Sequence, residues 1–210
     1  MRKTNRGFTL VELLIAISLA GLLMIGAVSI FTYSNRAYVV QDDVVATQQF
    51  VRSALEIMLH EIRMAGYIPP NFKGNMDSDE QIREATATAL TFVSDLNADG
   101  NPELVRYAVS ASTLTRQSWD WSAASSAWVP QTGAVTLAEN ITSLNFNYTY
   151  ADGTQGLPAS AQDRENIRAM SITLTGRTAN IDPDYTAPDG TKYHYRVLQT
   201  FVKMRNMGLQ

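Results

Sequence analysis

Residues 7–31 read GFTLVELLIAISLAGLLMIGAVSIF, and this stretch decides how the N-terminal part of the chain folds. Between residues 8 and 31 the only polar side chains are those of Thr9, Glu12, Ser18 and Ser29. These 24 residues exceed the roughly 20 that cross a bilayer as a helix. The residues before Phe8 carry three positive charges and no acid. The positive-inside rule therefore places residue 1 in the cytoplasm and the rest of the chain across the membrane.

A cleavable secretory signal fits this stretch poorly, because no small-residue A-x-A-like site ends the apolar run. Glu12 also lies inside the run. A carboxylate in hydrocarbon costs about 2.5–3.5 kcal/mol on insertion scales, so such a residue indicates a function and a partner of opposite charge.

Residues 7–16, GFTLVELLIA, preceded by a short basic leader, resemble the class III signal of type IV prepilins and pseudopilins. The resemblance implies that a membrane peptidase cuts between Gly7 and Phe8 and N-methylates Phe8, and that the apolar run stays in the mature chain. It also implies that Glu12 is the fifth residue of the mature chain and is needed for assembly of the subunits. On this interpretation Glu12 pairs with the new amino terminus of a neighbouring subunit. Two charges that are costly alone become tolerable when paired, and such a pair fixes the stagger between helices.

Beyond Tyr33 the sequence keeps a helical period with one apolar face. The apolar positions recur at spacings of three, four or seven: Val44, Val51, Ala54, Leu55, Met58, Ile62 and Ala65. Gly66 and the pair Pro69-Pro70 predict the end of the helix. We therefore expect a leader over 1–7, a helix over 8–66 and a β-rich head over 67–210. The helix would be a membrane or filament-core half over 8–33 and an amphipathic half over 34–66.

After a polar, acidic connector over 71–88, in which a short helix near 80–87 is one option, the period changes to two. Strands are predicted over 89–96, 103–109, 113–119, 141–150, 168–178 and 193–204. Alternation such as Leu144, Phe146 and Tyr148 with polar residues between them predicts a half-buried antiparallel sheet. The predicted fold class is α+β: a long N-terminal helix packed on an antiparallel sheet, which is also the pilin-like fold that the resemblance implies.

One loop carries a pattern of metal ligands. Asp95, Asn97, Asp99 and Glu103 place oxygen side chains at loop positions 1, 3, 5 and 9, and Gly100 allows a sharp turn between them. Several oxygens, two or three of them anionic, are what Ca²⁺ prefers. Position 12 would be Arg106, which excludes an EF-hand. A calcium loop and a plain polar hairpin turn with Asp-Gly at its tip both remain open.

Composition narrows the function further. The net charge of −3 argues against binding nucleic acid by electrostatics, and the absence of cysteine excludes disulfides and thiolate sites. Residues 60–64 begin like H-E-x-x-H but end in Met64, so they predict no zinc site. No enzyme motif was found, and no cofactor is required. Trp119, Trp121 and Trp128 would pack across a hairpin or form an adhesive patch.

The helix end over 52–67 and the segment 140–148 resemble PilW-type minor pilins, with PulJ/GspJ-type minor pseudopilins next. Major type IVa pilins usually close a C-terminal disulfide, and this chain has no cysteine. The resemblance implies a minor pilin that primes or caps a type IV pilus and is not an enzyme. Its implied partners are prepilin peptidase, the inner-membrane assembly platform and other minor and major pilins. Its implied location is the bacterial inner membrane with an extracytoplasmic head, then the pilus or its tip. The alternatives are a minor pseudopilin of type II secretion and a membrane-anchored, calcium-dependent adhesion module.

Overall fold

A single long helix, α1 (Leu10–Met64), begins the described part of the chain. The computed structural model describes residues 8–72, 81–131 and 133–208. The chain divides into two compact units, Met1–Asp43 and Val44–Gln210. We call the second of these the head unit.

In the first unit, the side chains of α1 are almost all exposed. This apolar stretch is long enough to cross a membrane, and none of it is buried against other described residues. Leu14 and Leu19 are each 57% exposed and Ile25 is 69% exposed, so these side chains pack against no other element among residues 8–72, 81–131 and 133–208. Its side chains need an apolar environment from outside the monomer.

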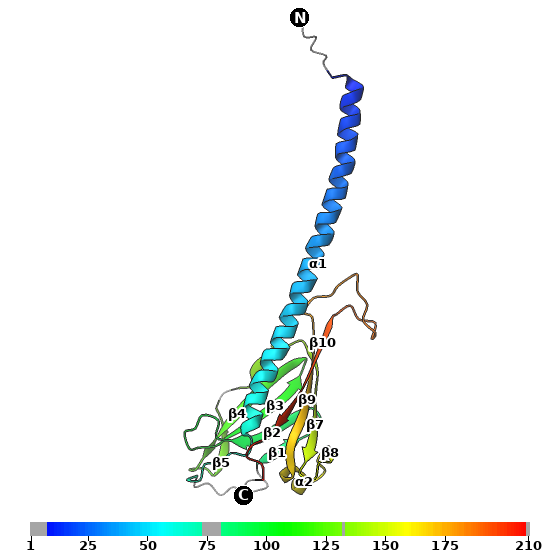
Figure 1. The fold of residues 1–210 in the computed structure, drawn as a ribbon. Helices are drawn as coiled ribbons and strands as arrows, with labels where there is room; N and C mark the ends of the chain where they lie inside the picture. Colours follow the sequence, from blue (N-terminus) through cyan, green and yellow to red (C-terminus); the bar gives the residue numbers. More distant parts are fainter. Residues whose placement is uncertain (1–7, 73–80, 132, 209–210) are drawn as a thin grey trace, which may run out of the picture. The chain divides into compact units, whose positions relative to one another are not determined.

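Within the head unit, the end of α1 lies against the strands (Figure 1). Its buried side chains are Thr47, Val51, Ala54, Leu55, Met58 and Ile62. The predicted apolar face is therefore confirmed, except that Val44 is only half-buried. Gly66 has a φ of +84°, the left-handed conformation that ends a helix and that glycine adopts without steric cost.

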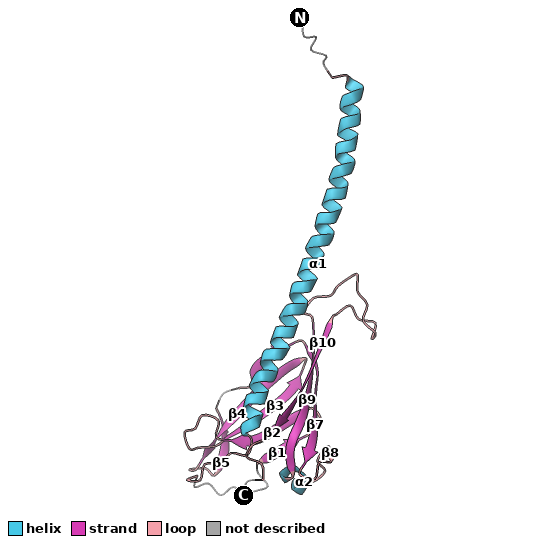
Figure 2. Cartoon of the chain, in the orientation of Figure 1, coloured by secondary structure: helices cyan, strands magenta, loops and turns pink. Residues whose placement is uncertain are grey.

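The strands form two antiparallel sheets, not the single sheet that the alternation predicted (Figure 2). The first contains β1 (Ile82–Ala85), β2 (Ala89–Ser94), β3 (Glu103–Ser110), β4 (Thr113–Ser122), β5 (Ala127–Pro130) and β6 (Val135–Glu139). Its order is β1-β2-β3-β4-β5, with β6 also paired to β4. The second contains β7 (Ile141–Tyr150), β8 (Gln155–Gly156), β9 (Ile167–Arg177) and β10 (Tyr195–Lys203), in the order β10-β9-β7-β8.

All six predicted strands are present, with ends that differ by at most three residues. The short helix near 80–87 is wrong: β1 occupies Ile82–Ala85 and pairs with β2. Residues 73–80 of the predicted connector lie outside the described residues. The sequence also missed β5, β6, β8 and a five-residue helix, α2 (Ala161–Glu165). The three missed strands are short and mostly exposed, so they lack the apolar alternation that marks a strand.

One hydrophobic core joins α1 to both sheets. Its largest fully buried side chains include Phe92, Tyr107, Phe146 and Tyr148. Helix and sheet approach closely at Gly176 in β9, where an added Cβ would lie 2.5 Å from Val51 Cγ2. The close approach requires glycine, because any larger side chain would overlap the helix.

Candidate functional site

The first candidate site is the start of α1. Gly7, the residue before the expected cut, lies outside the described residues. Phe8 precedes the helix, and its side chain is 90% exposed. The hydroxyl of Thr9 accepts a hydrogen bond from the Glu12 backbone N–H at 3.2 Å. In return, Glu12 Oε2 accepts from the Thr9 backbone N–H and from the Thr9 hydroxyl, both at 3.0 Å.

These reciprocal bonds are a capping box, in which the N-cap residue and the third helical residue satisfy each other's backbone N–H. The sequence analysis missed it, although the T-x-x-E spacing before an apolar run is its usual signal. Glu12 therefore has a role within its own chain, in addition to the assembly role that the resemblance implies. Any experiment on Glu12 has to separate the two.

The second candidate site is the loop between β2 and β3. One carboxylate oxygen from each of Asp95, Asp99 and Glu103 lies within 4.8 Å of the others. Asp95 and Glu103 are 2% and 4% exposed, whereas Asp99 is exposed. The loop turns through Ala98 and Gly100, whose φ angles of +59° and +89° are both left-handed. This curl brings positions 95, 99 and 103 together as the spacing suggested.

Backbone N–H groups hold two of these carboxylates in place. Asp95 Oδ2 accepts from the Gly100 N–H at 3.1 Å, and Glu103 Oε2 accepts from the Leu96 N–H at 2.8 Å. Asn97 faces Asp99: its Nδ2 donates to Asp99 Oδ2 at 3.0 Å, and its Oδ1 accepts from the Asp99 N–H at 2.9 Å. The described contacts of Asn97 are therefore to Asp99.

Burial raises the pKa of Glu103, and the negative charges of Asp99, Asp95 and Asp120 raise it further. The hydrogen bond from the Leu96 N–H acts in the opposite direction and only partly offsets them. Among the described residues, every charged group that shifts Glu103 is an acid. Negative charge is therefore concentrated around the partly buried Glu103, and no basic residue in the described part of the chain offsets it.

Two of the three tryptophans pack across a hairpin, whereas Trp119 lies opposite Pro130. Trp121 and Trp128 are directly opposite on β4 and β5, with ring centroids 5.3 Å apart in an edge-to-face arrangement. Phe72 extends the group, 6.3 Å from Trp121, and the Arg83 guanidinium lies 5.3 Å from the centre of the Trp128 ring. The sequence analysis offered cross-strand packing or an adhesive patch, and the contact between Trp121 and Trp128 is ordinary cross-strand packing.

The histidines lie apart. His60 is on the exposed face of α1. His194 Nε2 lies 3.0 Å from Asp182 Oδ2, and its ring stacks on Tyr185 at 4.0 Å between centroids. Neither histidine is part of a metal cluster among the described residues.

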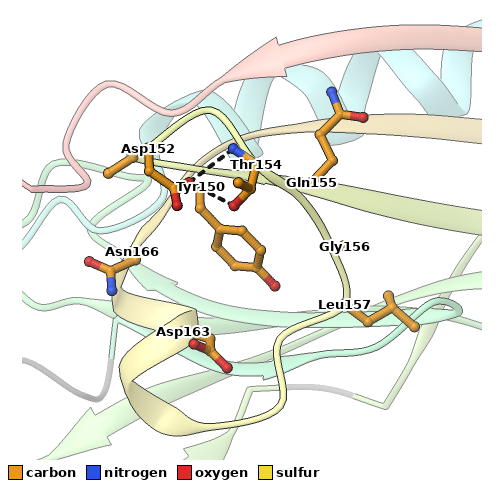
Figure 3. Close-up of a pocket in the computed structure, with 9 residues that line it drawn as sticks. Tyr150, Asp152, Thr154, Gln155, Gly156, Leu157, Asp163 and Asn166 are labelled. Carbon is orange, nitrogen blue, oxygen red and sulfur yellow. Dashed lines mark hydrogen bonds between the residues drawn. The ribbon is translucent and has the colours of Figure 1, made fainter.

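A cavity of about 510 Å³ opens between the β7–β8 turn and α2 (Figure 3). Its acidic groups already have partners: Asp152 accepts from the Thr154 backbone and hydroxyl, and Asp163 caps α2 at Ser160. The carboxylates of this cavity are therefore used by the local turn and helix cap, and the sequence analysis did not identify it.

Comparison with known proteins places these features in a family. Residues 2–28 match the family model of the prokaryotic N-terminal methylation motif. Residues 43–197, more than half of the chain, match the model of prepilin peptidase-dependent protein B. The chain belongs to the prepilin peptidase-dependent protein B family. No curated protein matches the sequence.

A solved structure agrees at the level of the fold. The type IV-like pilin from Thermus thermophilus superposes with a TM-score of 0.50 at 11% identity, over 77% of this chain and 98% of that chain. The resemblance to type IV prepilins and the α+β pilin-like fold are thus confirmed. Phe8 and Glu12 fall within the methylation motif, and the 95–103 loop falls within the family's head segment.

Proposed function

We propose that this member of the prepilin peptidase-dependent protein B family is a minor pilin that primes or caps assembly of a type IV pilus. Prepilin peptidase would cut between Gly7 and Phe8 and methylate Phe8, and the assembly platform would then draw the chain from the inner membrane into the filament. The observation that carries the proposal is the methylation motif over residues 2–28, followed by a helix whose apolar side chains are left exposed.

The same features suit the proposed partners and location. An exposed apolar helix can be held first by lipid and then by the helices of other pilins, because both environments are apolar. The head unit has its own core and stays outside the membrane in this model of function. Absence of cysteine favours a minor over a major subunit. The role proposed is structural, with no enzymatic step performed by this chain.

Glu12 provides the test, because its two roles can be separated. Glu12→Leu removes both the charge and the cap. Glu12→Gln removes the charge but keeps an acceptor for the Thr9 N–H, since glutamine also serves in a capping box. Thr9→Val keeps the charge and removes the hydroxyl of the cap, at a cost to the helix of about 1 kcal/mol.

The variants are compared in a strain that lacks its own copy of the gene. If Glu12 pairs with a neighbour's amino terminus, Glu12→Leu and Glu12→Gln both lose surface filaments, and Thr9→Val keeps them. Intact mass must show in each variant that the mature chain begins at Phe8 with one added methyl. Normal piliation with Glu12→Gln would refute the assembly role, because the cap alone would then suffice.

The nearest alternative, a minor pseudopilin of type II secretion, uses the same fold and the same processing. The same strains distinguish it: loss of protein secretion with unchanged piliation would assign the chain to that machine. A third alternative, a membrane-anchored adhesion module, predicts that Glu12→Leu changes neither process. In that case the helix would serve only as a tether.

A further inference from the structure

The acidic loop between β2 and β3 is the strongest chemical feature of the head unit that pilus assembly does not explain. Asp95 and Glu103 are almost fully buried, and they lie beside Asp99 with oxygens within 4.8 Å. Three like charges at such distances repel one another strongly, because partial burial lowers the local dielectric constant. A cation bound among the three carboxylates would relieve this repulsion.

Asp95 gives an independent indication that something is missing. Its Oδ2 accepts from the Gly100 N–H, but its Oδ1 is buried and has no hydrogen-bond partner among the residues that the structure describes. A buried, unpartnered carboxylate oxygen is costly, and native structures rarely keep one without an ion or a water. Asp95 belongs to the same cluster as Asp99 and Glu103. A cation held by this carboxylate would satisfy the unpaired oxygen.

The hydrogen bonds of the loop hold the carboxylates in place without neutralising them. The N–H groups of Leu96 and Gly100 fix one oxygen each of Glu103 and Asp95. These bonds leave Oδ1 of Asp95 without a partner among the described residues. Asn97 orients Asp99 from the outside of the loop through two hydrogen bonds. The arrangement is thus pre-organised for a positive ion.

We propose that the 95–103 loop binds one Ca²⁺ through the carboxylates of Asp95, Asp99 and Glu103. All three ligands are hard oxygens, which excludes a preference for a soft metal. An exposed, curled loop accommodates the irregular shell of six to eight oxygens that Ca²⁺ takes, with water completing it at the exposed side. Mg²⁺ fits less well, because it demands a tight octahedron and keeps its own waters.

The ion would also act on the end of the long helix. The Asp95 N–H donates to the Tyr67 carbonyl at 2.9 Å, directly after the helix terminus. One residue earlier, the Ser94 hydroxyl donates to the Met64 carbonyl at 2.7 Å. An ion that holds Asp95 would therefore also hold the hydrogen bonds between the end of α1 and the end of β2. Calcium would stabilise this junction in the extracytoplasmic space, where such modules work with dissociation constants of about 10⁻⁴–10⁻³ M.

The test uses the full chain in a nonionic detergent, stripped of metal with a chelator. Unfolding of the head is followed by tryptophan fluorescence, because all three tryptophans lie in β4 and β5. At 100 times its dissociation constant, Ca²⁺ should raise the ratio of folded to unfolded chain by about 100-fold. The melting midpoint should rise with Ca²⁺ and much less with the same concentration of Mg²⁺, and calorimetric titration should give one ion per chain.

Asp95→Asn separates binding from folding. Its oxygen can still accept from Gly100, and its amide can donate to a neighbouring carboxylate. In chelator this variant should be at least as stable as the wild type, and in Ca²⁺ it should be less stable. Asp152→Asn is the control, since Asp152 likewise accepts a hydrogen bond from a backbone N–H in a turn and lies outside the cluster. It should keep the full response to calcium.

Two results would overturn the proposal. Equal midpoints of the wild-type chain in calcium and in chelator would leave a polar hairpin turn. A full calcium response in Asp95→Asn would show that the ion binds elsewhere.

Discussion

Gly176 is the position where a single methyl group should test how tightly the helix packs on the second sheet. In Gly176→Ala the new Cβ would lie 2.5 Å from Val51 Cγ2 and 3.4 Å from Thr47 Cγ2. The first distance is far inside contact, and Val51 is only 1% exposed, so it has little space to move into. Either the helix or β9 must shift.

The magnitude follows from two opposing effects. Overpacking a well-filled core costs about 1–3 kcal/mol. Replacing glycine within a strand returns about 0.5–1 kcal/mol, because the unfolded chain loses freedom. The difference between these two effects is about 0–2.5 kcal/mol, so Gly176→Ala should lower the free energy of unfolding by about 1 kcal/mol at the centre of that range. Gly156→Ala in β8 is the matched control, since nothing lies within 4 Å of its added Cβ. It should be neutral or slightly stabilising.

A double variant makes the reasoning stricter. Val51→Ala alone should cost about 2–3 kcal/mol, from two lost carbons and the cavity that they leave. In the double variant with Gly176→Ala, the new methyl occupies part of that cavity. The double variant should thus be more stable than the sum of the two single effects, by about 1 kcal/mol or more. Urea unfolding of the full chain in detergent, followed by tryptophan fluorescence, measures the wild type, the two single variants, the double variant and the Gly156→Ala control. Additive effects, or a Gly176→Ala variant as harmless as Gly156→Ala, would refute the proposed contact.

Two further predictions concern charged groups in the head unit. Glu61 accepts hydrogen bonds from the Tyr107 hydroxyl and from Arg116 Nε, the latter at 2.9 Å, and the side chains of Glu61 and Arg116 are largely buried. Glu61→Leu should therefore lower the free energy of unfolding in urea by about 2–3 kcal/mol, which is less than the loss expected for a fully buried pair. The double variant with Arg116→Met should recover much of that loss, and no recovery would mean that the pair itself is stabilising. The hydrogen bond to His194 lowers the pKa of Asp182, so its stabilisation is complete above the unfolded pKa of about 3.9 and is lost as the pH falls further. Asp182→Asn should flatten this part of a plot of melting midpoint against pH, and an unchanged slope would contradict the assignment.

The sequence predicts the long helix and most strands because their burial follows simple periods. The core-facing residues of α1 and the alternation of Leu144, Phe146 and Tyr148 are both visible in the sequence and both confirmed. The division into two sheets is not visible there. All six residues of β2 are buried, so this strand shows no alternation that would assign it a face.

The change from one sheet to the other takes place at a single residue. β6 ends at Glu139 and β7 begins at Ile141, and Asn140 between them has a φ of +57°. Asparagine tolerates this left-handed conformation better than most residues. The sequence analysis predicted the strand that begins at residue 141 but not β6 before it, so the change of sheet was not predicted.

The acidic loop was also predicted only in part from the sequence. The spacing of Asp95, Asp99 and Glu103 predicts that they gather, because a loop with Gly100 at its turn can curl. The near-complete burial of Asp95 and Glu103 is not predictable, since it depends on how β2 and β3 pack against distant parts of the chain. Calcium binding at this loop stays a proposal. For Glu12 the opposite is true. The T-x-x-E spacing of its capping box is present in the sequence, but Glu12 was interpreted only as the assembly residue.

The C-terminal end of α1 has a mechanical consequence. The Met64 carbonyl accepts from Ser94 Oγ at 2.7 Å and from Asn206 Nδ2 at 3.0 Å, and the Arg63 carbonyl accepts from the Arg205 N–H at 3.0 Å. These bonds join the helix terminus to segments about 30 and 140 residues away in the chain. A pull on the helix would therefore load several bonds at once, together with the buried side chains of α1. Detaching the helix from the head by force would therefore require these bonds to break and the buried side chains of α1 to leave the core.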